Sequence, residues 1–251
     1  MNLVRQELHA LAAAVMFFTR VPVPAGWGGQ PADLQRAAGY FPLMGWLVGG
    51  VAAGVWWLAV QLWPPAVASG LSLAATLLLT GAFHEDGFAD VCDGFGGGYT
   101  KDRVLEIMRD SRVGAFGAIG AVMIVGLKWQ AVAHLPSSTA AAVILAAHVL
   151  SRTLSVSLMF VLSYVREDAA KAKPLATHLG GARALFAFTT GGSALALLPF
   201  GLWWVVLPLL ATQVWLAAWF KRRIGGYTGD CLGAAQQIAE VVLYLSVLTA
   251  P

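Results

Sequence analysis

Residues 41–63 read FPLMGWLVGGVAAGVWWLAVQLW and contain no charged side chain. A helix needs about 20 mostly apolar residues to cross the hydrocarbon core of a bilayer, so this segment is long enough to span a membrane. The whole chain shares this character, because 58% of its 251 residues are hydrophobic and only 12% are charged. A soluble domain has about 45–50% apolar and roughly 25% charged residues. We therefore expect lipid to surround most of this chain.

Six further apolar segments predict the remaining spans. Residues 8–18 are too short to cross a bilayer and instead predict a helix that lies in the membrane interface. We find neither an internal repeat nor a soluble domain, so we expect a single membrane-embedded domain over residues 1–251. The predicted fold is all-α, a polytopic integral membrane helical bundle of about seven transmembrane helices plus an N-terminal interfacial helix. The six further spans are residues 66–83, 114–133, 139–163, 184–200, 203–220 and 234–249.

Basic residues gather in four of the segments that flank these spans. With seven spans, the four segments lie on the same side of the membrane, which the positive-inside rule assigns to the cytoplasm. The net charge of +3 is too small to indicate nucleic-acid binding. In order of segment, the basic residues are Arg20 and Arg36; Lys101, Arg103, Arg109 and Arg112; Arg166, Lys171, Lys173 and Arg183; and Lys221, Arg222 and Arg223.

The densest polar pattern is residues 81–117, GAFHEDGFADVCDGFGGGYTKDRVLEIMRDSRVGAFG. Asp86, Asp90 and Asp93 stand at i, i+4 and i+7, which places them on one helix face at the predicted cytoplasmic end of the second span. Three carboxylates so close repel one another unless a cation lies between them. Carboxylate oxygens suit Mg²⁺, which commonly bridges protein and phosphate, although Mn²⁺ accepts the same ligands. We predict a metal site rather than a solvated helix end, because ionisable groups at membrane depth are costly.

Basic side chains follow these acids directly. Glycines at 94 and 96–98 end the acidic helix, and residues 100–112 predict an amphipathic helix on the cytoplasmic surface. Its arginines suit phosphate, although a basic helix attracted to anionic lipid is the plainer alternative. Acids for a metal beside bases for phosphates are the parts that phosphoryl or nucleotidyl transfer requires.

Other polar residues extend the candidate site. Thr228 and Asp230, in GGYTGDCLG at 225–233, complete a metal or substrate shell unless Asp230 is a simple helix N-cap. Lys128 and Arg152 lie within spans and should face the bundle or a polar cavity. The remaining candidates are His84 and Glu85, which lie off the aspartate face and favour hydrogen bonding or packing over metal ligation, and Asp110. The two cysteines, Cys92 and Cys231, show no metal-ligand spacing.

Several of these motifs resemble the cobalamin synthase family (adenosylcobinamide-GDP ribazoletransferases) over nearly the whole chain. The resemblance implies a Mg²⁺-dependent reaction of adenosylcobinamide-GDP with α-ribazole or its 5′-phosphate, which yields adenosylcobalamin or its 5′-phosphate and GMP. It also implies a multi-pass protein of a prokaryotic cytoplasmic (inner) membrane. The motifs are FFTRVPVP at 17–24, FPLMG at 41–45, GAFHEDGFADVCDG at 81–94, KDRVLEIMRDSRVGAFG at 101–117 and GGYTGDCLGA at 225–234.

The resemblance assigns roles to the candidate residues. Glu85 departs from the family pattern, where an apolar residue is expected, and the loop 166–183 is the least similar segment. The expected partners are the two substrates and the lipid bilayer, a homo-oligomer is compatible with the sequence, and no nucleic acid is expected. The implied catalytic acids and metal ligands are Asp86, Asp90 and Asp93, the basic motif is Arg103, Arg109 and Arg112, and the late motif is Thr228 and Asp230.

Three other classes of protein share some of these features. The CDP-alcohol phosphotransferases share D-x-x-D-G, which Asp90 to Gly94 fits, but Gly94 is not followed by Ala-Arg, and Ala234 stands where a second late acid is needed. A secondary transporter often shows two related halves, and none is present here. A purely structural membrane subunit would not explain why three acids are clustered on one helix.

Overall fold

The computed structural model describes residues 3–165 and 180–250, and in this part of the chain every regular element is helical. The all-α fold is therefore confirmed. The N-terminal half consists of α1 (Leu3–Phe18), α2 (Pro31–Ala37), η1 (Ala38–Tyr40), α3 (Phe41–Ala59), α4 (Pro65–Thr80), α5 (Phe83–Gly97) and α6 (Lys101–Ile107). The C-terminal half consists of α7 (Ala115–Ala133), α8 (Ala140–Val161), α9 (Gly181–Gly192), η3 (Ser193–Leu197), η4 (Phe200–Val205), α10 (Val206–Ile224) and α11 (Gly229–Leu248).

The described residues contain five helices long and apolar enough to cross a membrane, or up to six if the bent pair α4–α5 is one span. The chain is therefore a multi-pass membrane protein, with fewer qualifying spans than the seven expected. The five are Pro31–Ala59, Ala115–Ala133, Ala140–Val161, Phe200–Ile224 and Gly229–Leu248.

The expected span at 184–200 is the main difference in the count. It consists of the 12-residue α9 followed by the five-residue η3, and it does not qualify as a span. Two glycines end α9 and Pro199 follows η3. Both residue types destabilise an α-helix. Neither lowers the apolar character of the segment, so the hydrophobic pattern still predicted a span.

The expected span at 66–83 breaks between α4 and α5, where the chain bends by 88°. Gly81 and Ala82 both adopt left-handed backbone conformations, with φ of 67° and 58°. Arg20 supports the bend, since its backbone N–H donates to the Leu79 carbonyl at 2.8 Å and its guanidinium fills the space beside Gly81. The aspartates therefore follow the bend on a helix of their own, with Asp86 in its first turn, and their place at the end of a span depends on whether α4 and α5 form one broken span.

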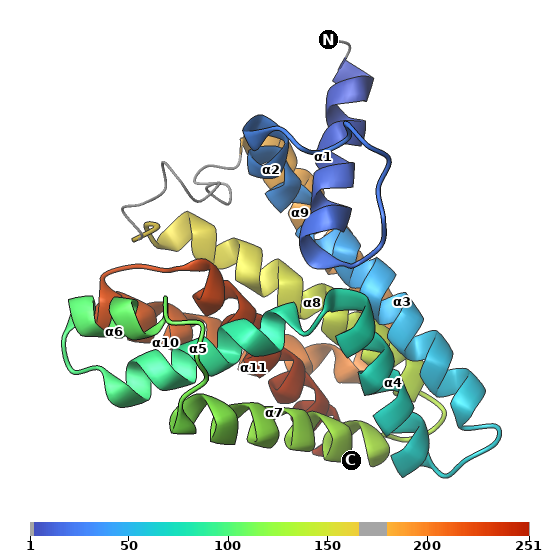
Figure 1. Ribbon diagram of the computed structural model, residues 1–251. Coiled ribbons are helices and arrows are strands. Elements are labelled where there is room, and N and C mark those ends of the chain that lie inside the picture. The colour runs from blue at the N-terminus through green and yellow to red at the C-terminus, as the bar shows by residue number, and fades with distance from the viewer. Residues whose placement is uncertain (1–2, 166–179, 251) are drawn as a thin grey trace.

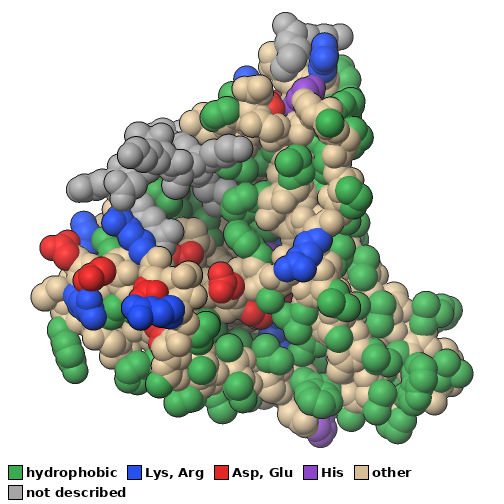
Figure 2. Space-filling model, in the orientation of Figure 1, with side chains coloured by type: hydrophobic (Ala, Val, Ile, Leu, Met, Phe, Trp, Pro, Cys, Tyr) green, Lys and Arg blue, Asp and Glu red, His purple; other side chains and the backbone are tan. Residues whose placement is uncertain are grey.

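α11 is the central helix of the bundle and contacts α5, α7, α8 and α10, while α3 packs against α8 (Figure 1). Glycines allow these close approaches. A Cβ on Gly45 would lie 2.6 Å from the His148 carbonyl oxygen, and a Cβ on Gly233 would lie 3.2 Å from that of His84. The spans carry exposed apolar side chains such as Val122 and Leu207, as expected for lipid contact. Hydrophobic side chains also cover much of the face that Figure 2 shows.

Candidate active site

The helix α5 carries the three aspartates of the acidic motif in one continuous helix, as predicted. Their environments differ, because Asp86 is exposed, Asp90 is partly buried and Asp93 is buried with 9% of its surface exposed. Asp86 and Asp90 are therefore more accessible from outside the bundle than Asp93.

Asp93 contacts the first turn of α7. Its Oδ2 accepts a hydrogen bond from the Gly114 N–H at 2.7 Å, and its Oδ1 accepts one from the Gly117 N–H at 2.8 Å. The first N–H groups of a helix have no partner within the helix and carry partial positive charge, and Gly114, the N-cap of α7, has no side chain to cap them. A Cβ on Gly114 or Gly117 would clash with the carboxylate. The two glycines of RVGAFG therefore leave room for the Asp93 side chain of α5 at the start of α7.

The late motif meets the acidic helix at Gly87. A Cβ on Gly87 would lie 3.0 Å from the Cα of Asp230, so α5 and the start of α11 approach at backbone distance. The alternative of Asp230 as an N-cap is not what the structure shows. Thr228 is the N-cap, its hydroxyl accepts from the Cys231 N–H at 3.4 Å, and Asp230 lies in the first turn, with its Oδ2 3.3 Å from the Thr228 hydroxyl.

A cavity of about 610 Å³ lies beside Asp93, between the end of α5, helix α6 and the start of α7. Two arginines of the basic motif line it, each paired with an acid. Arg103 lies 2.8 Å from Glu106, and Arg112 lies 2.6 Å from Asp110. The hydrogen bonds from Arg112 lower the pKa of Asp110 to about 2, so this carboxylate is ionised at physiological pH.

The basic helix is shorter than expected, since α6 ends at Ile107 rather than near residue 112. The Asp110 carboxylate accepts a hydrogen bond from the Arg112 backbone N–H at 3.1 Å, a local turn that competes with helical hydrogen bonds. The amphipathic character is confirmed, because Val104 and Leu105 are buried. Arg109 is exposed and does not line the cavity.

The two basic residues within spans face the bundle, as predicted, and meet a carboxylate that the sequence analysis missed. Glu240 on α11 is fully buried and lies 2.7 Å from Lys128 on α7, 2.7 Å from His148 and 3.6 Å from Arg152, both on α8. Lys128 also lies 3.6 Å from Glu85 of α5. These five residues, which we call the Glu240 network, connect four helices.

Two glutamines add hydrogen bonds to the Glu240 network. Gln237 accepts from Lys128 at 3.0 Å and donates to Glu85 at 2.9 Å, and Gln236 donates to Glu240. An ionisable residue inside an apolar span usually has a polar partner and a function. The position of Glu240 inside an apolar span, one helical turn after Gln236, could therefore have identified it as a candidate functional residue from the sequence.

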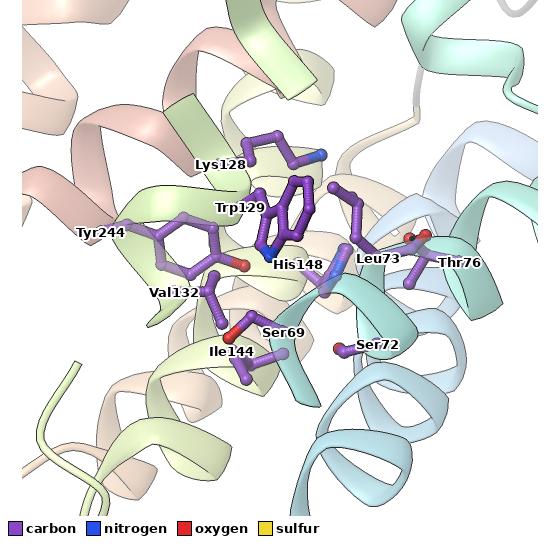
Figure 3. A pocket seen from close by; sticks show the side chains of 10 residues that line it. All are labelled: Ser69, Ser72, Leu73, Thr76, Lys128, Trp129, Val132, Ile144, His148 and Tyr244. Carbon is purple, nitrogen blue, oxygen red and sulfur yellow. Dashed lines mark hydrogen bonds between the residues drawn. The ribbon is translucent and has the colours of Figure 1, made fainter. Parts of the chain in front are cut away.

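A small cavity borders the Glu240 network on the side of α4, and Figure 3 shows Lys128, His148 and Tyr244 around it. Its volume of about 20 Å³ holds roughly one water molecule, which is too little for a substrate. None of the three aspartates lines it.

His84 is buried and its ring stacks on Phe18 with 5.6 Å between ring centroids. Packing, the role that the sequence favoured over metal ligation, is what the structure shows.

Arg223 fixes the other end of α5 and was also missed as a contributor to the site. Its guanidinium donates to the carbonyl oxygens of Phe95 at 2.6 Å and Gly98 at 2.8 Å. The last carbonyls of a helix have no partner within the helix, so Arg223 caps α5.

The donors of the acidic helix fit a magnesium ion only in part. In the portion of the chain that the structure describes, no three His, Cys, Asp or Glu side chains are grouped to hold a metal. Mg²⁺ usually keeps several waters and takes one or two carboxylates plus substrate phosphates. Asp86 and Asp90 suit that pattern, whereas both oxygens of Asp93 already accept hydrogen bonds. The predicted set of three aspartate ligands stays a prediction.

Comparison with known proteins gives the same family over almost the full length. The family model described as cobalamin-5-phosphate synthase matches residues 10–248. A protein of Ralstonia pickettii named adenosylcobinamide-GDP ribazoletransferase is 50% identical, over 99% of this chain and 98% of its own length. Proteins of the same name from Ralstonia nicotianae, at 49% identity over 97% and 96%, and Leptothrix cholodnii, at 45% over 96% of each, are also similar. No solved structure matches.

Matches of this length and identity extend through the acidic helix, the basic loop and the start of α11. The chain is a transferase and belongs to the cobalamin-5-phosphate synthase family.

Proposed function

We propose that the chain joins adenosylcobinamide-GDP to α-ribazole, or to α-ribazole 5′-phosphate, and releases GMP. A ribose hydroxyl oxygen attacks the phosphorus on the corrinoid side of the diphosphate. A P–O bond forms to that oxygen, the bond from the same phosphorus to the bridging oxygen breaks, and the hydroxyl proton passes to a base. The products are adenosylcobalamin, or its 5′-phosphate, and GMP, which makes this the last assembly stage of cobalamin biosynthesis.

The observation that supports this proposal is the meeting of three motifs at one end of the bundle. The arginines of the 610 Å³ cavity lie beside the second half of α5, where Asp93 and Gly97 line the cavity, and Asp230 of α11 lies against Gly87 in the first half of the same helix. Transfer between phosphates depends mainly on positioning and on neutralising charge, and these groups serve both purposes. The names of the relatives agree with this chemistry.

The charges of the cavity support a divalent cation. Its lining includes two guanidinium groups, Arg103 and Arg112, against three carboxylates, Asp93, Glu106 and Asp110. A diphosphate would add further negative charge, so the arginines must exchange partners or a cation must enter with the substrate. We propose Mg²⁺ held by Asp86 and Asp90, which would neutralise charge on the diphosphate. Mn²⁺ suits the same oxygen donors.

We propose that the charged end of the molecule, around α5 and α6, lies on the cytoplasmic side of the membrane. Lysines, arginines and acids gather over α5 and α6, whereas the α3–α4 end is mostly hydrophobic (Figure 2). The positive-inside rule places such an end in the cytoplasm, which in a prokaryote puts the protein in the inner membrane. Arg166, Lys171 and Lys173, which entered the same prediction, lie outside the described residues.

GMP release by protein purified into lipid tests the proposal, with adenosylcobinamide-GDP, α-ribazole and Mg²⁺ as the reactants. We expect release to require all three, and Asp86→Asn and Asp90→Asn each to lower kcat by at least about 100-fold. Asp102→Asn is the matched control, because Asp102 is an exposed acid of α6 outside the cavity lining and should lower kcat far less. A folded protein that is inactive with these substrates but transfers from a CDP-alcohol would show that the substrate assignment is wrong.

A further inference from the structure

Asp93 is the most buried of the three aspartates, and both of its carboxylate oxygens accept hydrogen bonds. Two backbone N–H groups of α7 bind its two oxygens at 2.7 and 2.8 Å, and the side chain is buried. A carboxylate at a helix N-terminus is stabilised by the partial positive charge of the unpaired N–H groups. The charge of Asp93 is therefore compensated by the protein itself.

The contact also shapes the 610 Å³ cavity. Gly114, Ala115 and Phe116 form the start of α7 and line the cavity together with Arg112, which stands two residues before Gly114. Arg112 lies in the loop between α6 and α7, so fixing Gly114 at the end of this loop restricts where Arg112 lies. Asp93 thus connects the acidic helix to the basic loop.

We infer that Asp93 is a positioning residue, which holds the start of α7 and with it Arg112, rather than a metal ligand. The inference deepens the proposed function, on which its activity measurements rest. Its structural measurements do not depend on the reaction. Metal binding, in contrast, belongs to Asp86 and Asp90.

The glycines of α7 provide the decisive variants, because Gly117→Ala removes no carboxylate from the protein but breaks the contact of Asp93 with α7. A Cβ at Gly117 would clash with the Asp93 carboxylate, whereas a Cβ at Gly126 of the same helix would meet nothing within 4 Å. Gly117→Ala and Asp93→Ala should therefore give the same defect, and Gly126→Ala should behave as the wild type. Asp93→Asn, which retains one carbonyl oxygen to accept one N–H, should be intermediate.

Hydrogen exchange of the full chain in micelles measures the contact directly. We expect Asp93→Ala and Gly117→Ala to speed exchange of the amides at 114–118 by about 10-fold or more, since about 1.4 kcal/mol of lost protection corresponds to that factor. In the transfer assay, both should raise KM for adenosylcobinamide-GDP more than they lower kcat, with a total loss in kcat/KM of about 10–100-fold, as is usual for residues that orient a functional group.

Binding of Mn²⁺ alone, followed by its paramagnetic resonance signal, separates the two roles of an aspartate. Asp93→Ala and Gly117→Ala should keep the wild-type Mn²⁺ affinity within about threefold, whereas Asp86→Asn and Asp90→Asn should lose it. Loss of Mn²⁺ binding in Asp93→Ala but not in Gly117→Ala would overturn the inference, as would unchanged exchange at 114–118 in both variants. Absence of Mn²⁺ binding by the wild type would count against the metal of the proposed function, and the exchange comparison would still decide the role of Asp93.

Discussion

At the scale of single residues, Glu240 is the group on which the buried charges depend. Two cations, Lys128 and Arg152, lie in the interior of a membrane protein, and Glu240 is within 4 Å of both. Glu85 contributes a second carboxylate beside Lys128. Because Glu85 directly precedes Asp86, the Glu240 network also holds the first turn of the acidic helix.

We predict that Glu240→Gln destabilises the protein by about 3–5 kcal/mol, because it leaves Lys128 buried without its closest counter-charge. The double variant Glu240→Gln/Lys128→Met should be more stable than the sum of the two single changes by about 1–3 kcal/mol. Denaturant unfolding in micelles measures these differences. Glu106→Gln breaks an exposed pair and should cost less than about 1 kcal/mol. Additive effects of the two buried changes would contradict the coupling.

At the scale of elements, α5 is held at three places. The Glu240 network contacts its first turn through Glu85, Asp93 joins its middle to α7, and Arg223 caps its last carbonyls. The 88° bend at Gly81–Ala82 separates this helix from α4, so its direction depends on these contacts rather than on the preceding span. Fixing the helix in this way fixes Asp86 and Asp90 relative to the cavity.

Arg223→Gln should therefore loosen the end of α5. It removes charged hydrogen bonds to the Phe95 and Gly98 carbonyls, which are typically worth about 1.5–3 kcal/mol. We expect a lower unfolding free energy by that amount and faster hydrogen exchange at residues 97–100. Arg222→Gln is the matched control, since Arg222 is the exposed neighbour of Arg223. Equal effects of the two substitutions would show that Arg223 does not cap the helix.

At the scale of the whole molecule, the number of crossings depends on the bent pair α4–α5. If it is one broken span, its two ends lie on opposite sides of the membrane; if it is re-entrant, they lie on the same side. The charged end of the molecule, formed by α5, α6 and the end of α10, favours the first arrangement, because it separates the basic residues from the apolar turn before α4.

Labelling with a membrane-impermeant maleimide in vesicles of known orientation tests this arrangement. In a background with Cys92 and Cys231 replaced by serine, we expect Tyr99→Cys to react from the cytoplasmic face and Leu62→Cys from the opposite face. Both positions are well exposed, at 96% and 74%. Arg222→Cys should react from the cytoplasmic face and serves as the reference. Reaction of positions 62 and 99 from the same face would establish a re-entrant pair.

The sequence by itself determined the features that depend on local pattern and on solvent. Apolar length identified five helices of spanning length, the spacing of the acidic motif put Asp86, Asp90 and Asp93 in one helix, and the cost of charge in lipid turned Lys128 and Arg152 inward. Each of these follows from helical periodicity or from transfer energy, which act on residues close together in the chain.

Only the tertiary structure decided which groups these residues meet. The three aspartates share a helix, yet Asp93 binds the start of α7, and Lys128 of α7 pairs with Glu240 of α11. The bend at Gly81–Ala82 likewise depends on Arg20, which reaches it from the segment after α1. Periodicity fixes the face of a helix on which a side chain lies, but its partner is set by helices distant in sequence, whose packing no local pattern encodes.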